Sequence, residues 1–252
     1  MISAALRKIV LRTFSLASIV ALAACASANS TKTSMLAEIS VGEQFLENGQ
    51  YERGYSILTA VAEANPSSSV AVLALADAYY RQNAVLKASG FYQKAIELGA
   101  TKGGRLGLAK IELARNNAQS AIEQLKMVLA SEPESADALN GMGVAHDLVA
   151  DHNAAQAFYR RVLSRDPSDK RALNNLALSL ALSGKATAAL PSISELSRSN
   201  LSDKTVRQNL AIIQYLSGAT AQAVKTATID LEQADAENNF RALGYSLPRP
   251  GM

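Results

Sequence analysis

The stretches Gly141-Met142-Gly143-Val144-Ala145 and Asn175-Leu176-Ala177-Leu178-Ser179 decide the fold of this 252-residue chain. They stand 34 residues apart, and the apolar residues around both recur at spacings of three and four. That spacing is typical of an α-helix with one buried face. Gly143 and Ala177 occupy the same place in the two stretches, and a small residue there lets a second helix approach closely. The pattern therefore predicts repeated pairs of closely packed helices.

Small residues continue at this spacing through most of the chain. In the first helix of each predicted pair they are Gly42, Ala76, Ala109, Gly143, Ala177 and Ala211, and in the second Gly54, Ala88, Ala121, Ala155, Ala189 and Ala223. Pro66, Pro133 and Pro167 each end a helical pattern, because the residue before proline disfavours helix. Turn residues stand at Asn48-Gly49, Gly184 and Gly218. The sequence thus predicts six helix-turn-helix units, at about 35–68, 69–101, 102–135, 136–169, 170–203 and 204–230.

The period and these residues resemble the tetratricopeptide repeat. The resemblance implies an all-α, right-handed solenoid, in which six repeats over 35–230 bury their apolar faces against one another. A capping helix is expected within 231–243, where Ala236, Phe240 and Leu243 form one apolar stripe. Residues 244–252, with two prolines, are expected to be disordered.

The N-terminus reads as an export signal. Arg7, Lys8 and Arg12 accompany an apolar run, 14–24, that is shorter than the roughly 20 residues a membrane-spanning helix needs. The ending Leu22-Ala23-Ala24-Cys25 resembles the lipobox of bacterial lipoproteins, which implies cleavage of residues 1–24 and acylation of Cys25. Residues 25–34 would form a flexible tether. The alternative is an ordinary secretory peptide that leaves a free thiol.

The residue after this cysteine is alanine, not aspartate, which favours the outer membrane by analogy with enteric sorting. We therefore expect a lipid-anchored protein on the periplasmic face of the outer membrane, with sorting to the inner membrane left open. Of the 25 basic residues, three lie in residues 1–24, so the mature chain has 22 basic residues against 22 acidic ones. A formally neutral chain gives no reason to expect a nucleic-acid partner. A single cysteine excludes an intramolecular disulfide.

Residues that could carry catalysis are sparse. His146 and His152 stand six apart with no carboxylate or cysteine at metal-ligand spacing, so we expect no metal site. The glycines at 103, 104 and 107 lack the strand and the Lys-Ser/Thr pair of a phosphate loop. No serine lies in a Gly-x-Ser-x-Gly turn. We therefore expect a chain that is not an enzyme and has no cofactor.

A peptide groove is the remaining candidate site, on the concave wall that the first helices would form. Positions 2, 5, 9 and 12 of a unit share one helical face. In the last three units these positions are Asp137, Asn140, Val144 and Asp147; Arg171, Asn174, Leu178 and Ala181; and Thr205, Gln208, Ile212 and Tyr215. Asn175 and Asn209 lie beside them in Asn-Leu-Ala contexts. Amides can pair with a peptide backbone, while the apolar residues can receive an anchor side chain. The alternative for each amide is that it pairs with neighbouring backbone.

The C-terminal half resembles a narrower family. Segments 174–184 (NNLALSLALSG), 206–211 (VRQNLA) and 234–240 (ADAENNF) resemble the TadD family of tight-adherence (Flp) pilus assembly lipoproteins, over roughly residues 136–243. The resemblance implies a pilotin-like role, in which the acylated chain stabilises or targets secretin subunits. It brings no established contact residues, so the groove positions rest on geometry alone.

Two other functions stay open from the sequence. A general envelope adaptor would dock a peptidase or a peptidoglycan enzyme through the same surface, and a scaffold for outer-membrane protein assembly would serve many barrel proteins. The identity of the partner and the oligomeric state are likewise open.

Overall fold

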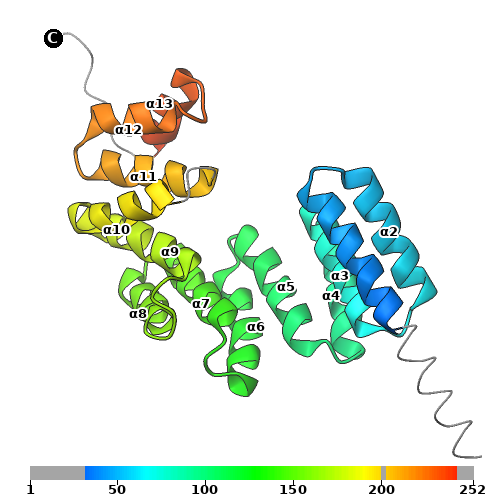
Figure 1. The fold of residues 1–252 in the computed structure, drawn as a ribbon. Helices are drawn as coiled ribbons and strands as arrows, with labels where there is room; N and C mark the ends of the chain where they lie inside the picture. The colour runs from blue at the N-terminus through cyan, green and yellow to red at the C-terminus, as the bar shows by residue number, and fades with distance from the viewer. Residues whose placement is uncertain (1–31, 200–202, 243–252) are drawn as a thin grey trace, which may run out of the picture. The chain divides into compact units, whose positions relative to one another are not determined.

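The computed structural model describes residues 32–199 and 203–242, and every regular element within them is helical. The first helix covers 32–47. The others are α2 (Tyr51–Ala64), α3 (Ser69–Arg81), α4 (Val85–Glu97), α5 (Thr101–Ala114), α6 (Ala118–Ser131), α7 (Ala136–Leu148), α8 (His152–Leu163), α9 (Lys170–Leu180), the π-helical turn η1 (Ala181–Lys185), α10 (Ala186–Ser199), α11 (Lys204–Leu216), α12 (Thr220–Ala227) and α13 (Gln233–Ala242). The predicted all-α architecture of six helix pairs and a closing helix is confirmed (Figure 1). The predicted signal peptide, Cys25 and the tail 244–252 lie outside the described residues.

One residue with a positive φ angle joins the two helices of every pair. These residues are Gly49, Asn83, Asn116, Ala150, Gly184 and Gly218. Successive members stand 34 residues apart, except for 33 between Asn83 and Asn116. The predicted turn glycines are therefore found where expected, because glycine adopts this left-handed conformation without a Cβ clash. The one short interval shows that the imperfect third unit has lost a residue.

The connections between pairs follow from proline and from capping side chains. Pro66, Pro133 and Pro167 each lie between the end of a second helix and the start of the next first helix. The side chain of Asp169 accepts a hydrogen bond from the Ala172 backbone N–H at 2.7 Å, which caps the start of α9. Such caps satisfy backbone donors that a helix start leaves unpaired.

The helices of a pair pack closely at the small positions. At Gly143 in α7, an added Cβ would lie 2.3 Å from a ring carbon of Tyr159 in α8. At Gly54 in α2, it would lie 2.5 Å from the side chain of Leu46. Both partners are buried, so glycine is what allows these helices to come together.

The chain forms two compact units, Met1–Gly104 and Arg105–Met252, which divide within α5. The first contains a cluster built around Leu58, Val61 and Leu75. The second contains several clusters, including one around Ile193 between α9, α10 and α11, and one around Phe240 beneath α13. Each hydrophobic core thus consists of side chains from neighbouring helix pairs.

The N-terminal end of the repeat region differs slightly from expectation, and the C-terminal end agrees with it. Residues 32–34, assigned to the flexible tether, are helical, and Ser34 Oγ donates to Glu38 Oε1 at 2.9 Å one turn on. Their Ser and Thr content indicated a linker, but one turn of helix pairs these residues locally. At the other end, Ala236 and Phe240 form the expected buried stripe of α13. Leu243 lies outside the described residues.

One stretch among the described residues, Lys170–Ser199, is long and apolar enough by composition to cross a membrane. It is not a single rod, because Gly184 has φ +82° and separates α9 from α10. These helices have 11 and 14 residues, each short of the roughly 20 that a span requires. Since α9 and α10 pack against each other, the stretch is a helix pair of the repeat.

Candidate peptide-binding site

The first helices of the second unit form a continuous layer. α7 contacts α9, and α9 contacts α11, whereas the second helices α8, α10 and α12 make no comparable contacts with one another among the described residues. A stack in which one layer is more closely spaced curves toward that layer. The surface of α7, α9 and α11 is therefore the concave wall of this unit.

An apolar row crosses this wall. Val144, Leu178 and Ile212 stand 34 residues apart on successive first helices, and all three are half-buried. One turn further along, Leu148 and Leu182 are 41% and 44% exposed. Leu148 and Leu182 were not among the predicted site residues, although their spacing of four from Val144 and Leu178 places them on the same helical face. Neighbouring repeats thus present exposed aliphatic side chains in register.

Three of the predicted amides bond to one another beside this row. Asn209 Nδ2 donates to Asn174 Oδ1 at 3.0 Å, and Asn174 Nδ2 donates to Asn175 Oδ1 at 3.3 Å. These hydrogen bonds link α11 to α9, so part of the hydrogen-bonding capacity of the amides holds repeats five and six together. Asn174 is buried, while Asn175 is half-buried and faces a cavity.

The cavity lies where α5, α7 and α9 meet and has a volume of about 90 Å³. Four predicted site residues line it: Asp137, Asn140, Arg171 and Asn175. Arg171 donates to Asp137 Oδ1 at 2.5 Å, and both side chains of this ion pair are at least half exposed. Asn140 is only 1% exposed, and neither atom of its amide has a hydrogen-bond partner. The cavity thus combines an exposed ion pair with a buried, unpaired amide.

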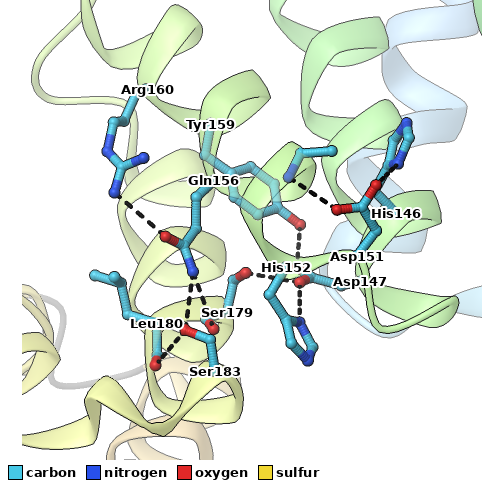
Figure 2. Close-up of polar contacts among 11 residues, drawn as sticks. His146, Asp147, Asp151, His152, Gln156, Tyr159, Arg160, Ser179, Leu180 and Ser183 are labelled. Atoms are coloured by element: carbon cyan, nitrogen blue, oxygen red, sulfur yellow. Dashed lines mark hydrogen bonds and ion pairs between the residues drawn. The ribbon is translucent and has the colours of Figure 1, made fainter.

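Asp147, predicted to face the groove, is the centre of a hydrogen-bond network. Tyr159 Oη donates to its Oδ2 at 2.9 Å, and Ser179 Oγ donates to its Oδ1 at 2.6 Å (Figure 2). His152 Nδ1 lies 2.8 Å from Oδ1, and because an ionised carboxylate can only accept, this nitrogen carries the proton. The carboxylate of Asp147 therefore joins α7, α8 and α9, and a role in binding a peptide stays a prediction.

Two further hydrogen bonds connect α8 to the following repeat. Gln156, which is buried on α8, donates through Nε2 to Ser183 Oγ at 3.0 Å and to the Ser179 carbonyl at 3.4 Å (Figure 2). Burial of the Tyr159 phenol, together with the charge and hydrogen bond of Asp147, raises its pKa above the ordinary value. The phenol thus stays protonated as a donor at physiological pH.

A known family of repeat proteins has this arrangement of helix pairs, and its family model matches the sequence. The family model described as tetratricopeptide repeat matches residues 42–102, 106–148 and 150–199, which together exceed half of the chain. The chain belongs to the tetratricopeptide repeat family. No curated protein sequence matches it significantly.

Solved tetratricopeptide repeat structures share the fold of this chain. One is a tetratricopeptide repeat protein from Parabacteroides merdae, with 15% identity, a TM-score of 0.60, and coverage of 84% of this chain and 94% of that one. A thermophilic repeat protein from Thermus thermophilus has 17% identity, a TM-score of 0.65, and coverage of 72% and 99%. PilW, described as a widely conserved type IV pilus biogenesis factor, has 16% identity, a TM-score of 0.63, and coverage of 84% and 94%. At these identities the likeness concerns the fold alone.

Two further predicted groove residues of this tetratricopeptide repeat protein, Gln208 and Tyr215, have partners within the chain. Gln208 Nε2 donates to the Ala227 carbonyl at 3.5 Å and lies 3.4 Å from Asp230 Oδ2. Arg207 also donates to both oxygens of Asp230, which holds the pKa of that carboxyl below its ordinary value. Gln208 is thus engaged by the second helix of its own repeat.

Tyr215 lies in the C-terminal core instead of the groove. Its ring stacks on Phe240 of α13, with the ring centroids 4.6 Å apart and the planes within 7°. Only 6% of Tyr215 is exposed. The closing helix α13 covers this position of the last repeat.

The contribution of α5 to the cavity was not among the predicted site residues. Leu106, Lys110 and Leu113 line the cavity from α5. With the third repeat starting at 102, they are its positions 5, 9 and 12, which are groove positions of the other repeats. The repeat register itself therefore indicates these three positions.

The Asp147 network contains serine, histidine and aspartate, but not in the order that catalysis by a serine nucleophile requires. In such a triad the serine hydroxyl bonds to the histidine. Here Ser179 bonds directly to Asp147 and is fully buried. Within residues 32–199 and 203–242, no three His, Cys, Asp or Glu side chains are placed to hold a metal ion. The arrangement is suited to joining repeats four and five.

Proposed function

We propose that this chain is a lipid-anchored scaffold that holds a protein partner on its concave wall during assembly of tight-adherence (Flp) pili. The observation that carries the proposal is the wall itself. Half-buried Val144 and Leu178 lie in register on α7 and α9, and exposed Leu148 and Leu182 follow one turn on. Val144 also lines a cavity that contains an unpaired amide. In this proposal the protein acts by binding alone and catalyses no reaction.

A polypeptide segment is the ligand that matches this surface. Aliphatic side chains of a partner can pack on Val144, Leu178 and Ile212, while its backbone can pair with amides of the wall. The 34-residue period repeats this surface along the stack, so an extended segment meets the same chemistry at successive repeats.

The place in pilus assembly rests on two resemblances. The C-terminal half resembles the TadD lipoproteins in residues 174–184, 206–211 and 234–240. The fold is similar to that of PilW, which is described as a type IV pilus biogenesis factor. Both support a pilotin-like role in which the partner is a secretin or another pilus assembly component.

The lipid on Cys25 would make this binding local. Several acyl chains hold a protein firmly at a bilayer, since each buried CH₂ contributes about 0.8 kcal/mol. Residues 26–31 add a reach of at most roughly 20 Å before the first described helix. Confinement near the periplasmic face of the outer membrane raises the effective concentration of a partner in that membrane, so a modest affinity suffices.

Replacing Cys25 with serine is expected to release the protein from the membrane and abolish pili. The physical reason is loss of the acylated residue, while the folded repeats stay intact. Membrane fractionation and electron microscopy of piliation measure the two effects. Ser27→Ala, two residues along, is the matched control and is expected to leave both unchanged.

The outcomes separate this proposal from the other functions. Normal piliation in the Cys25→Ser strain would contradict tethering as the basis of function. Defects in cell shape or division without loss of pili would favour an envelope adaptor for a peptidase or peptidoglycan enzyme. A joint loss of many barrel proteins would favour an outer-membrane assembly scaffold.

A further inference from the structure

The cavity at the meeting of α5, α7 and α9 has an apolar floor. Leu106, Ala109, Leu113, Leu125 and Val144 line it, and its volume is about 90 Å³. An apolar cavity of about 150 Å³ holds a benzene ring. The space here is therefore sized for an aliphatic side chain such as valine, isoleucine or leucine, and too small for an aromatic one.

Asn140 supplies the polar part of this cavity. Its side chain is 1% exposed, and both its Nδ2 and its Oδ1 lack a hydrogen-bond partner. Buried polar groups are nearly always paired, so an amide left in this state calls for a partner outside the chain. A donor and an acceptor side by side complement the C=O and N–H groups of a peptide backbone.

The charges at the rim favour an acidic ligand. Lys110 is exposed and forms no ion pair among the described residues, and Arg171 is paired only with the exposed Asp137. Exposed ion pairs contribute little, so Arg171 can exchange Asp137 for a carboxylate of the ligand at small cost. Two cations against one anion leave the rim with an excess positive charge.

We propose that this cavity is the anchor site for one aliphatic residue within an acidic, extended segment of the protein partner. The aliphatic side chain fills the apolar floor, and its backbone pairs with the Asn140 amide. Carboxylates next to it in the ligand meet Lys110 and Arg171. This assignment rests on the proposed function in that the partner is a polypeptide bound by the concave wall.

A display library of random peptides, selected on the full-length protein in detergent, tests the assignment. The wild type is expected to enrich peptides with one valine, isoleucine or leucine flanked by aspartate or glutamate. Asn140→Leu, which removes the unpaired amide but keeps the volume, is expected to weaken the selected peptides at least tenfold. Its thermal midpoint is expected to stay the same or rise, which separates lost binding from lost folding.

A charge reversal gives a second readout with a matched control. Lys110→Glu is expected to remove the preference for acidic flanks. Lys126→Glu makes the same charge change at an exposed position on the second helix α6 and is expected to leave selection unchanged. Enrichment of aromatic or basic motifs, no enrichment, or full affinity in Asn140→Leu would each overturn the assignment.

Failure here is distinguishable from failure of the proposed function. If crosslinking in cells from Leu178 still captures a pilus assembly protein, only the cavity assignment falls. If neither experiment finds a polypeptide on this wall, both fall together.

Discussion

Replacing Asp147 with alanine is expected to lower the free energy of unfolding by about 4 kcal/mol. The change removes the acceptor for Tyr159, Ser179 and His152 at once. Tyr159 and Ser179 are buried, so their hydroxyl groups would lose their partner where water does not reach. Hydrogen bonds to a charged group contribute about 1.5–3 kcal/mol each, and relaxation recovers part of the sum.

Urea unfolding followed by circular dichroism measures this loss. Asp137→Ala is the matched control, because it removes a carboxylate of the same helix whose ion pair with Arg171 is exposed. The control is expected to cost less than about 1 kcal/mol. Equal effects of the two substitutions would show that Asp147 does not hold repeats four and five together.

Gly143→Ala is expected to cost about 3 kcal/mol, although alanine is the better helix former. An added Cβ would lie 2.3 Å and 2.5 Å from two ring carbons of Tyr159. Tyr159 cannot turn away freely, since it is 1% exposed and its hydroxyl is bonded to Asp147. Overpacking of this kind forces helices apart and typically costs about 1–3 kcal/mol or more.

Gly90→Ala is expected to change the free energy of unfolding in the opposite direction in the same experiment. Gly90 lies inside α4, is exposed, and an added Cβ there meets nothing within 4 Å. This substitution is expected to stabilise the protein by about 0.5–1 kcal/mol, through helix propensity alone. A stability gain in Gly143→Ala would contradict the close approach of α7 and α8.

The helix pairs were predictable because their signals are local. Proline before three of the first helices, turn residues between the two helices of a pair and small residues at crossing positions all act within one repeat. The position of Gly184 between α9 and α10 follows directly from such a signal. The repeat period then placed Leu178 and Ile212 on the same layer, where the structure also has them.

Side-chain partners across repeats were not predictable from the register. Asp147 and Tyr215 both occupy position 12 of their repeats. The Asp147 carboxylate accepts hydrogen bonds from Tyr159 and Ser179, whereas the Tyr215 ring stacks on Phe240. The difference comes from what packs next to each repeat, a following pair or the closing helix. Gln208 donates through Nε2 to Asp230 Oδ2, because that carboxylate lies within the same repeat. The unpaired amide of Asn140 likewise shows only in three dimensions.

The most direct test of the account is photocrosslinking in cells from Leu178, followed by mass spectrometry of the captured protein. Leu178 lies on the apolar row of α9, whereas Gln208 is engaged by its own repeat. Met127, 49% exposed on the second helix α6, is the control position. The account predicts capture of a secretin or another pilus assembly protein from Leu178 and not from Met127. Capture from Met127 alone would contradict the claim that the concave wall binds the partner.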